Sequence, residues 1–151
     1  MAALAWVVHD KIKEYEGNKV IDFDTDAFKM ILALSTSNIA TTSIDALSTV
    51  TNEHANANGY TTGGAACASP TWTESSGTVT FDCADVVWTA SGGSIVAKFA
   101  AIYDDTVASP VVDPVVCHSQ LDDSSPGANI TATDGNTLTV AINASGVFTK
   151  S

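Results

Sequence analysis

The sequence contains no arginine and only six lysines, against seventeen aspartate and glutamate residues, so its formal net charge is −11 over 151 residues. A protein that holds phosphate groups needs a basic patch, and arginine is the side chain that binds phosphate through two parallel hydrogen bonds. Six scattered lysines do not form such a patch. We therefore expect no contact with nucleic acid or with an anionic membrane. The acidity favours solubility, with repulsion of like surfaces as the alternative role.

A long apolar run is also missing. Residues 1–8 are apolar, but a membrane-spanning helix takes about 20 such residues. The first lysines follow this run, whereas the basic region of a signal peptide precedes its apolar core. Neither a transmembrane helix nor a signal peptide of the usual form is therefore expected.

Ligands for soft metals are few and badly spaced. The chain has three cysteines and three histidines: Cys67, Cys83, Cys117, His9, His54 and His118. No Cys-x-x-Cys pair occurs, and the adjacent Cys117 and His118 would point to opposite faces of a strand, so we expect no zinc site. Three widely spaced cysteines are no disulfide framework. Two alternatives stay open: buried free thiols, or one bridge with one free thiol, for which Cys67 and Cys83 are the conceivable pair.

Motifs of catalytic and cation sites are missing as well. The glycine-rich stretch 59–64 is not followed by Lys-Ser/Thr and opens no helix, so its glycines are better explained by a sharp chain path than by phosphate binding. The acids at 22–26, 104–105 and 122–123 lack the glycine and distal glutamate of a calcium loop, and we interpret them as solvated turn residues. No Gly-x-Ser-x-Gly is present. We expect no enzyme, no metal and no cofactor.

What the sequence does have is a pair of strand patterns at its centre. Side chains alternate from Thr78 to Cys83, which is typical of a half-buried strand. Residues 95–103 are apolar on one face and, apart from Lys98, on the other as well, which predicts a strand inside a sheet, covered on both sides. We predict an all-β, mainly antiparallel domain, a single sandwich or barrel-like unit with one N-terminal helix.

The remaining segments are predicted to be strands and loops added to this pair. Strands are expected at 19–23, 28–34, 65–73, 137–143 and 146–148, with a hairpin connection at 74–77. Residues 44–50 stay open between a helical turn and an extended segment. Residues 107–117 contain Pro110 and Pro114, which interrupt ladder hydrogen bonds and place this segment at a sheet edge or outside the sheet.

The N-terminal segment is the best helix candidate. Apolar residues recur at helical spacing from Leu4 to Tyr15, and Gly17 ends the pattern. We predict a helix or arm at 1–18 and a β domain at 19–151. The candidate contacts with an oligomer partner or a capsid are Leu4, Trp6, Val8, Ile12 and Tyr15. On this hypothesis, removal of residues 1–16 leaves the β domain folded and weakens assembly.

Five stretches, in chain order, resemble one family of small structural proteins of tailed bacteriophages. They are the acidic strand at 21–34, the Gly-Tyr-Thr-Thr-Gly-Gly at 59–64, the two central strands at 81–90 and 100–106, and the carboxyl end at 134–148. The order of all five makes the resemblance specific, and together they span most of the chain. Two segments, 66–73 and 115–119, depart from the family pattern.

Members of this family are similar to capsid decoration, or cement, proteins. The resemblance implies a virion structural protein without catalytic residues, made in the host cytoplasm and placed on the capsid exterior. It would bind the major capsid protein as a homo-oligomer, most often a trimer, and stabilise the shell. The alternative is a tail-associated or receptor-binding module in which Trp72 and Trp88 bind carbohydrate; the other interpretation of these tryptophans is that they anchor the core.

Overall fold

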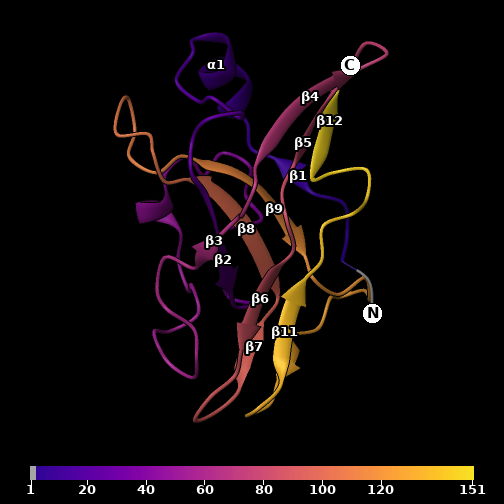
Figure 1. Cartoon of the computed structure of the whole chain (residues 1–151). Helices are drawn as coiled ribbons and strands as arrows, with labels where there is room; N and C mark the ends of the chain where they lie inside the picture. Colours follow the sequence, from indigo (N-terminus) through magenta and orange to yellow (C-terminus); the bar gives the residue numbers. More distant parts are fainter. Residues whose placement is uncertain (1–2) are drawn as a thin grey trace.

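The largest element of the fold is an open five-stranded antiparallel sheet. The computed structural model describes residues 3–151 (Figure 1). The strand order is β1-β9-β8-β2-β3, with β1 at Val7–Val8, β9 at Val115–Gln120, β8 at Phe99–Asp104, β2 at Phe28–Ala33 and β3 at Ala65–Ala66. All six residues of β8 are buried, and β9 and β2 pair with it on its two sides. The prediction of a doubly covered central strand is confirmed for this stretch.

Three smaller antiparallel sheets and two short helices complete the chain. A three-stranded sheet has the order β12-β5-β4, and two pairs are formed by β11 with β6 and by β10 with β7. Their bounds are β4 Thr71–Ser75, β5 Thr78–Asp82, β6 Val86–Thr89, β7 Ile95–Ala97, β10 Ile130–Ala132, β11 Thr137–Val140 and β12 Phe148–Lys150. Helix α1 spans Ile12–Gly17, and a 3-10 turn spans Leu47–Thr49. The mainly antiparallel β class with one short N-terminal helix is confirmed, but the five-stranded sheet is open and not a closed barrel.

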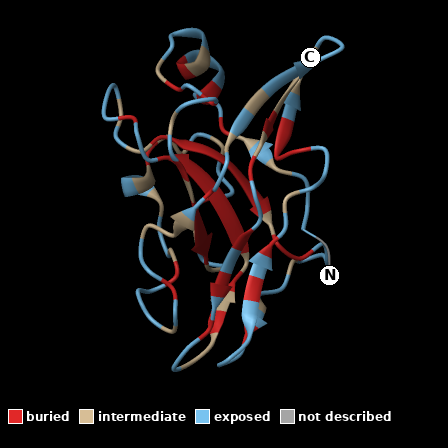
Figure 2. Ribbon diagram, viewed as in Figure 1, coloured by how far each residue is buried: buried red, intermediate tan, exposed pale blue. Residues whose placement is uncertain are grey.

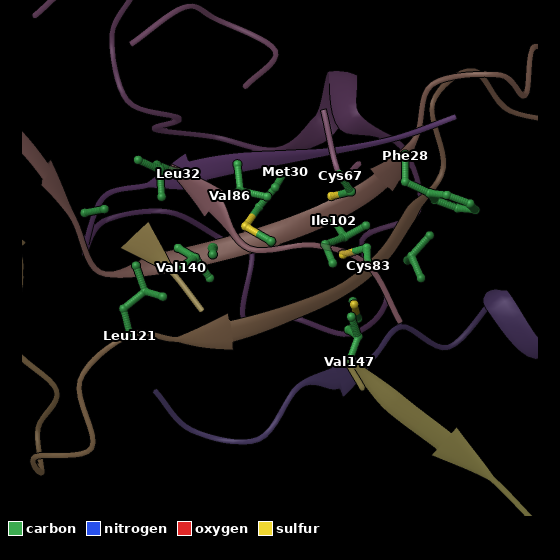
Figure 3. Close-up of a cluster of buried hydrophobic side chains, with 14 of the residues drawn as sticks. Phe28, Met30, Leu32, Cys67, Cys83, Val86, Ile102, Leu121, Val140 and Val147 are labelled. Atoms are coloured by element: carbon green, nitrogen blue, oxygen red, sulfur yellow. The ribbon is translucent and has the colours of Figure 1, made fainter. Parts of the chain in front are cut away.

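The core lies on both faces of the five-stranded sheet, which Figure 2 shows as the buried centre of the molecule. The larger cluster joins β2 and β8 to the small sheets, and Figure 3 shows Phe28, Met30, Leu32 and Ile102 beside Cys67, Cys83, Val86, Val140 and Val147. The smaller cluster, on the opposite face, contains Ile31, Ala33, Phe99, Ala101 and Tyr103. Residues 44–50 cover it, through Ile44, Leu47 and Val50. Burial on both faces explains why β8 carries apolar residues at every position but its last.

The predicted single strand at 95–103 is broken at Lys98. Residues 95–97 form β7 and pair with β10, whereas β8 begins at Phe99 and pairs with β2 and β9. The backbone N–H of Lys98 donates to the carbonyl of Ala33 instead. As a result Ile95 and Ala97 belong to the larger cluster, and Phe99 belongs to the smaller one. The alternation of side chains is therefore not continuous across Lys98, and the sequence pattern alone does not show this break.

The helix predicted from Leu4 to Tyr15 is wrong in its first half. Val7 and Val8 form strand β1, opposite His118 and Cys117 of β9. Branched side chains at Cβ favour a strand, and pairing with β9 overrides the helical spacing. The helix is limited to Ile12–Gly17, and its Ile12 and Tyr15 join the same core as the β domain. Residues 1 and 2 of the predicted arm at 1–18 lie outside the described residues.

Two other predicted segments also differ from the structure. Residues 19–23 form no strand, because the chain turns at Lys19, whose φ is 58°, and again at 22–26. The stretch 107–117 is irregular only as far as Pro114; from Val115 onward it is β9, an interior strand. Pro114 lies just before the ladder, where a missing N–H costs no strand pairing. The segment 44–50 contains both open alternatives, a bridge at Ala46 and a 3-10 turn after it.

The glycine-rich stretch 59–64 brings two backbones into close contact. Gly64 has a φ of 75°, and a Cβ there would lie 1.9 Å from the carbonyl oxygen of Met30. Gly59 has a φ of 87°, and its Cβ would lie 2.1 Å from the carbonyl oxygen of Thr89. A side chain at either position is excluded by the neighbouring strand as well as by the backbone angle. The stretch is thus a structural clamp between this loop and the strands β2 and β6.

Gly64→Ala is expected to destabilise the protein more than Gly135→Ala. Gly135 has a similar φ of 83° with nothing within 4 Å of an added Cβ, so its substitution carries only the left-handed backbone cost of about 1–2 kcal/mol. Gly64→Ala adds a clash with β2, for a total above about 3 kcal/mol. Urea unfolding of both variants measures the difference. Equal losses of unfolding free energy in the two variants would contradict the role of Gly64 in a clamp.

Candidate functional site

The five candidate contact residues divide into two groups. Leu4 is 46% exposed, while Trp6 and Val8 are partly buried, and all three line one groove. Ile12 and Tyr15 are instead core residues, 0% and 6% exposed. The hydroxyl of Tyr15 donates to Asp45 at 2.8 Å, and burial together with this carboxylate raises the pKa of Tyr15 to about 12. One helix was expected to carry all five side chains; the turn at residues 9–11 separates them into two groups.

The groove lies between the N-terminal segment and the end of the chain. Ala3, Leu4, Ala5, Trp6 and Val8 line one side, and residues 141–143 and 145–149 line the other. Its volume is about 900 Å³, and none of the lining residues is charged. In Figure 1 the indigo N-terminal segment and the yellow C-terminal segment run down the same side of the molecule. The sequence had no local signal for this groove, because its walls come from opposite ends of the chain.

Both walls of the groove contain edge strands. β1 is the outermost strand of the five-stranded sheet, and β12 is the outermost strand of the three-stranded sheet. The N–H of His9 donates to the carbonyl of Val116 at 2.9 Å. Because antiparallel strands alternate in the direction of their backbone groups, the N–H and C=O of Val8 point away from β9. Within residues 3–151 these two groups form no backbone hydrogen bond, so the apolar groove borders an open strand edge.

A buried histidine pair holds the N-terminal segment in place. His9 Nδ1 lies 2.7 Å from the carbonyl oxygen of Ile44, and His9 Nε2 lies 3.0 Å from His118 Nδ1. A carbonyl oxygen only accepts, so His9 carries its hydrogen on Nδ1, and its Nε2 accepts a hydrogen bond from His118. The pair thus links three segments that the sequence places far apart, and sequence analysis missed it for that reason.

Burial keeps both histidines neutral. It lowers the pKa of His9, against weaker opposing effects from the Ile44 carbonyl and from Asp10 and Asp45. Burial and the neighbouring His9 lower the pKa of His118 to about 4. Since the unfolded chain then binds protons more readily, the contribution of the pair is present above pH 6.5 and is lost as the pH falls toward 4.

The acidic clusters mostly serve as hydrogen-bond acceptors in turns. Asp22 accepts from the N–H of Asp24, and Asp122 accepts from the N–H groups of Ser124 and Ala128. Between residues 3 and 151 no three His, Cys, Asp or Glu side chains are grouped as a metal site would require. Two of these acids are not solvated as expected: Asp122 is 1% exposed within its own turn, and Asp104 is fully buried at the end of β8.

The buried carboxyl of Asp104 is only half satisfied. Its Oδ1 accepts from the N–H groups of Thr106 and Val107 at 2.8 and 3.3 Å, whereas Oδ2 has no hydrogen-bond partner among the residues that the structure describes. Burial, and to a smaller extent the nearby Asp26, raise the pKa of Asp104 to about 7. A raised pKa stabilises the folded state below pH 3.8, and this contribution is lost as the pH rises through 7, opposite to the effect of the histidine pair.

Asp104→Asn is expected to stabilise the protein at high pH. Asparagine keeps the acceptor for Thr106 and Val107 but does not ionise, so the variant should match the wild type near pH 4 and exceed it by about 2 kcal/mol at pH 8. Urea unfolding at both pH values measures this. The control is Asp134→Asn, an exposed aspartate that also accepts a backbone N–H, from Gly92. A difference that does not vary with pH would rule out ionisation of Asp104 as its cause.

The cysteines and tryptophans are core residues. Cys67, Cys83 and Cys117 are free and buried, which confirms the free-thiol alternative, and burial raises the pKa of the Cys117 thiol well above its usual value. Trp88 is 5% exposed, and Trp72 is partly buried and stacks on Phe23 with 4.8 Å between ring centroids. The interpretation as a core anchor is confirmed for Trp88, and Trp72 packs against the same cluster with part of its surface still exposed.

Ile12→Ala and Leu4→Ala separate the core role from a contact role. Ile12→Ala leaves a cavity and is expected to lower the free energy of unfolding by about 2–4 kcal/mol. Leu4→Ala is expected to change it by less than about 0.5 kcal/mol, because Leu4 is exposed. Urea unfolding checks both values. Because Ile12 is a core residue, removal of residues 1–16 is expected to destabilise the β domain, contrary to the hypothesis from the sequence. A deletion variant with the same free energy of unfolding as the wild type would contradict the core role of Ile12.

Comparisons with known proteins identify no relative. The chain matches no protein-family model, no curated protein and no solved structure. Within residues 3–151 there is also no helix with the length and apolar character needed to cross a membrane. The groove, the histidine pair and Asp104 are therefore interpreted from their own chemistry, and the family from the sequence resemblance alone.

Proposed function

We propose that this protein is a capsid decoration protein, which binds the outer face of a bacteriophage shell and stabilises it. The observation that carries the proposal is the ordered resemblance of five stretches, from residue 21 to residue 148, to a family of small phage structural proteins. The partner would be the major capsid protein, and the protein would act as a homo-oligomer, most often a trimer. No catalytic role is proposed.

The resembling stretches coincide with the framework of the fold. They contain all of β2, β6 and β11, most of β8, and the close approaches at Gly59 and Gly64, but only one end each of β5 and β12. Such positions determine how the chain folds, so the resemblance supports a shared architecture. It does not locate the contact surface, because surface residues vary independently of the core.

Charge and exposed apolar residues are compatible with an outer position on a particle. A chain with a net charge of −11 and no arginine is poorly suited to a surface that faces packaged DNA. Among residues 3–151, four large apolar side chains are exposed: Leu4, Val7, Val87 and Val112. Leu4 lines the groove, where a partner chain would bury it, and Val7 lies in the same N-terminal segment.

Binding to purified particles tests the proposal. The protein is expected to co-sediment with expanded capsid shells that lack it and to raise their resistance to heat, because several weak contacts from one oligomer act together. It should show little affinity for DNA at physiological salt. Tails from the same phage are the parallel sample. Binding to tails alone would replace decoration by the tail-module alternative, and tight, salt-sensitive DNA binding would overturn both.

A further inference from the structure

We propose that the groove between β1 and residues 141–149 binds an extended segment of a partner chain, which adds a strand to the open edge of β1. The segment would place apolar side chains at alternate positions in the groove and a basic side chain beside Asp85. This deepens the proposed function, on which it rests for the identity of the partner as a shell protein. The groove itself is argued from its own backbone, lining and charge.

The first argument is the backbone of β1. An edge strand with unpaired N–H and C=O groups is the template on which extended peptides bind. Val8 lines the groove and directs these groups away from β9, since the neighbouring His9 is already paired with Val116 of β9. The histidine pair fixes this edge, so a segment that binds does not have to order it first.

The second argument is the lining. A groove of about 900 Å³ lies in the range of ligand sites in proteins, roughly 300–1,000 Å³. Apolar side chains from both walls, such as Leu4, Trp6, Ile142 and Phe148, would contact every second residue of an added strand. A small apolar molecule would fill this space but leave the backbone groups of Val8 unpaired. The combination favours a peptide.

The third argument is charge. Asp85 is exposed, and its Oδ1 accepts the N–H of Ile142 at 2.8 Å, so its carboxylate lies at the end of the groove that Ile142 lines. Within residues 3–151, Asp85 forms no ion pair with a lysine. At the other end, Lys150 pairs with Glu16 and is near Lys13, so no acidic excess exists there. A basic residue beside Asp85 is therefore complementary, whereas a second copy would bring another net charge of −11.

Synthetic peptides provide the test. The probe has about eight residues, alternating valine and threonine between lysine ends, so that either strand direction places a lysine beside Asp85. Binding is followed by fluorescence anisotropy of the labelled peptide and by hydrogen exchange. We expect saturable binding that protects the amide of Val8 from exchange. A peptide with proline at its central positions should not bind, because proline removes the donor.

Matched variants locate the binding. Ala5→Lys and Ala141→Lys place a charge in the groove and should weaken binding at least ten-fold. Ala108→Lys makes the same change at an exposed position outside the groove and should leave binding unchanged. Equal effects of all three variants, or no effect of any, would overturn the assignment of the groove. If Ala141→Lys instead converts an oligomer to a monomer in sedimentation, the occupant is a second copy and the proposal is wrong.

Asp85→Asn tests the charge separately. Asparagine keeps the acceptor for the N–H of Ile142, and we expect binding of the lysine peptide to fall at least three-fold, to the level of the same peptide with glutamine ends. Asp134→Asn, at a matched exposed aspartate, should have no effect. If the wild type binds the lysine and glutamine peptides equally well, the claim that the partner segment carries a basic residue beside Asp85 is wrong.

Shell-binding measurements on the same variants distinguish a failure of the groove proposal from a failure of the proposed decoration function. If Ala5→Lys and Ala141→Lys bind shells as the wild type does, decoration stands and the groove is not the contact. If the wild type binds peptides through the groove but binds no shells, the groove stands and decoration fails. Loss of shell binding in the two groove variants, with Ala108→Lys unaffected, supports both.

Discussion

Burial of β8 on every side is the constraint on which the rest of the structure depends. Its backbone pairs with β2 on one side and with β9 on the other, and its faces contribute to two separate apolar clusters. A strand with this environment tolerates no charge at its centre. The small sheets must therefore cover one face, and the segment 44–50 must cover the other, which explains why a chain of many short strands forms one connected core.

Two buried titratable groups of this sheet have opposite effects on stability. His118 in β9 and Asp104 at the end of β8 are both almost inaccessible to water, and burial favours the neutral form of each. Acid charges the histidine pair, whereas alkali charges the aspartate. As the pH rises, the histidine pair contributes more to the free energy of unfolding and Asp104 contributes less, over overlapping pH ranges. The stability of the wild type is therefore expected to vary less with pH than it would with only one of these groups.

The sequence predicts the parts of the fold that depend on local pattern. The buried stretch 99–103, the strand at 28–34 and the hairpin at 74–77 follow from alternation and turn chemistry, and the structure contains all three. The N-terminal segment is different, since residues 7–8 fit a helical spacing but pair with a strand more than 100 residues away. The groove and the histidine pair likewise join distant segments, and no single-sequence pattern reports such pairing.

The β1 edge differs from the edges at β4, β12 and β3 in how it is protected. β4 is preceded by Pro70 and contains Glu74, β12 ends in Lys150, and β3 lies against β6. Proline, charge and coverage are the usual means by which proteins prevent unwanted strand pairing. β1 is uncharged, lies in an apolar groove and is held rigidly by His9. The β1 edge is short, but it is neither charged nor covered. It can therefore still pair with an added strand, as a binding edge must.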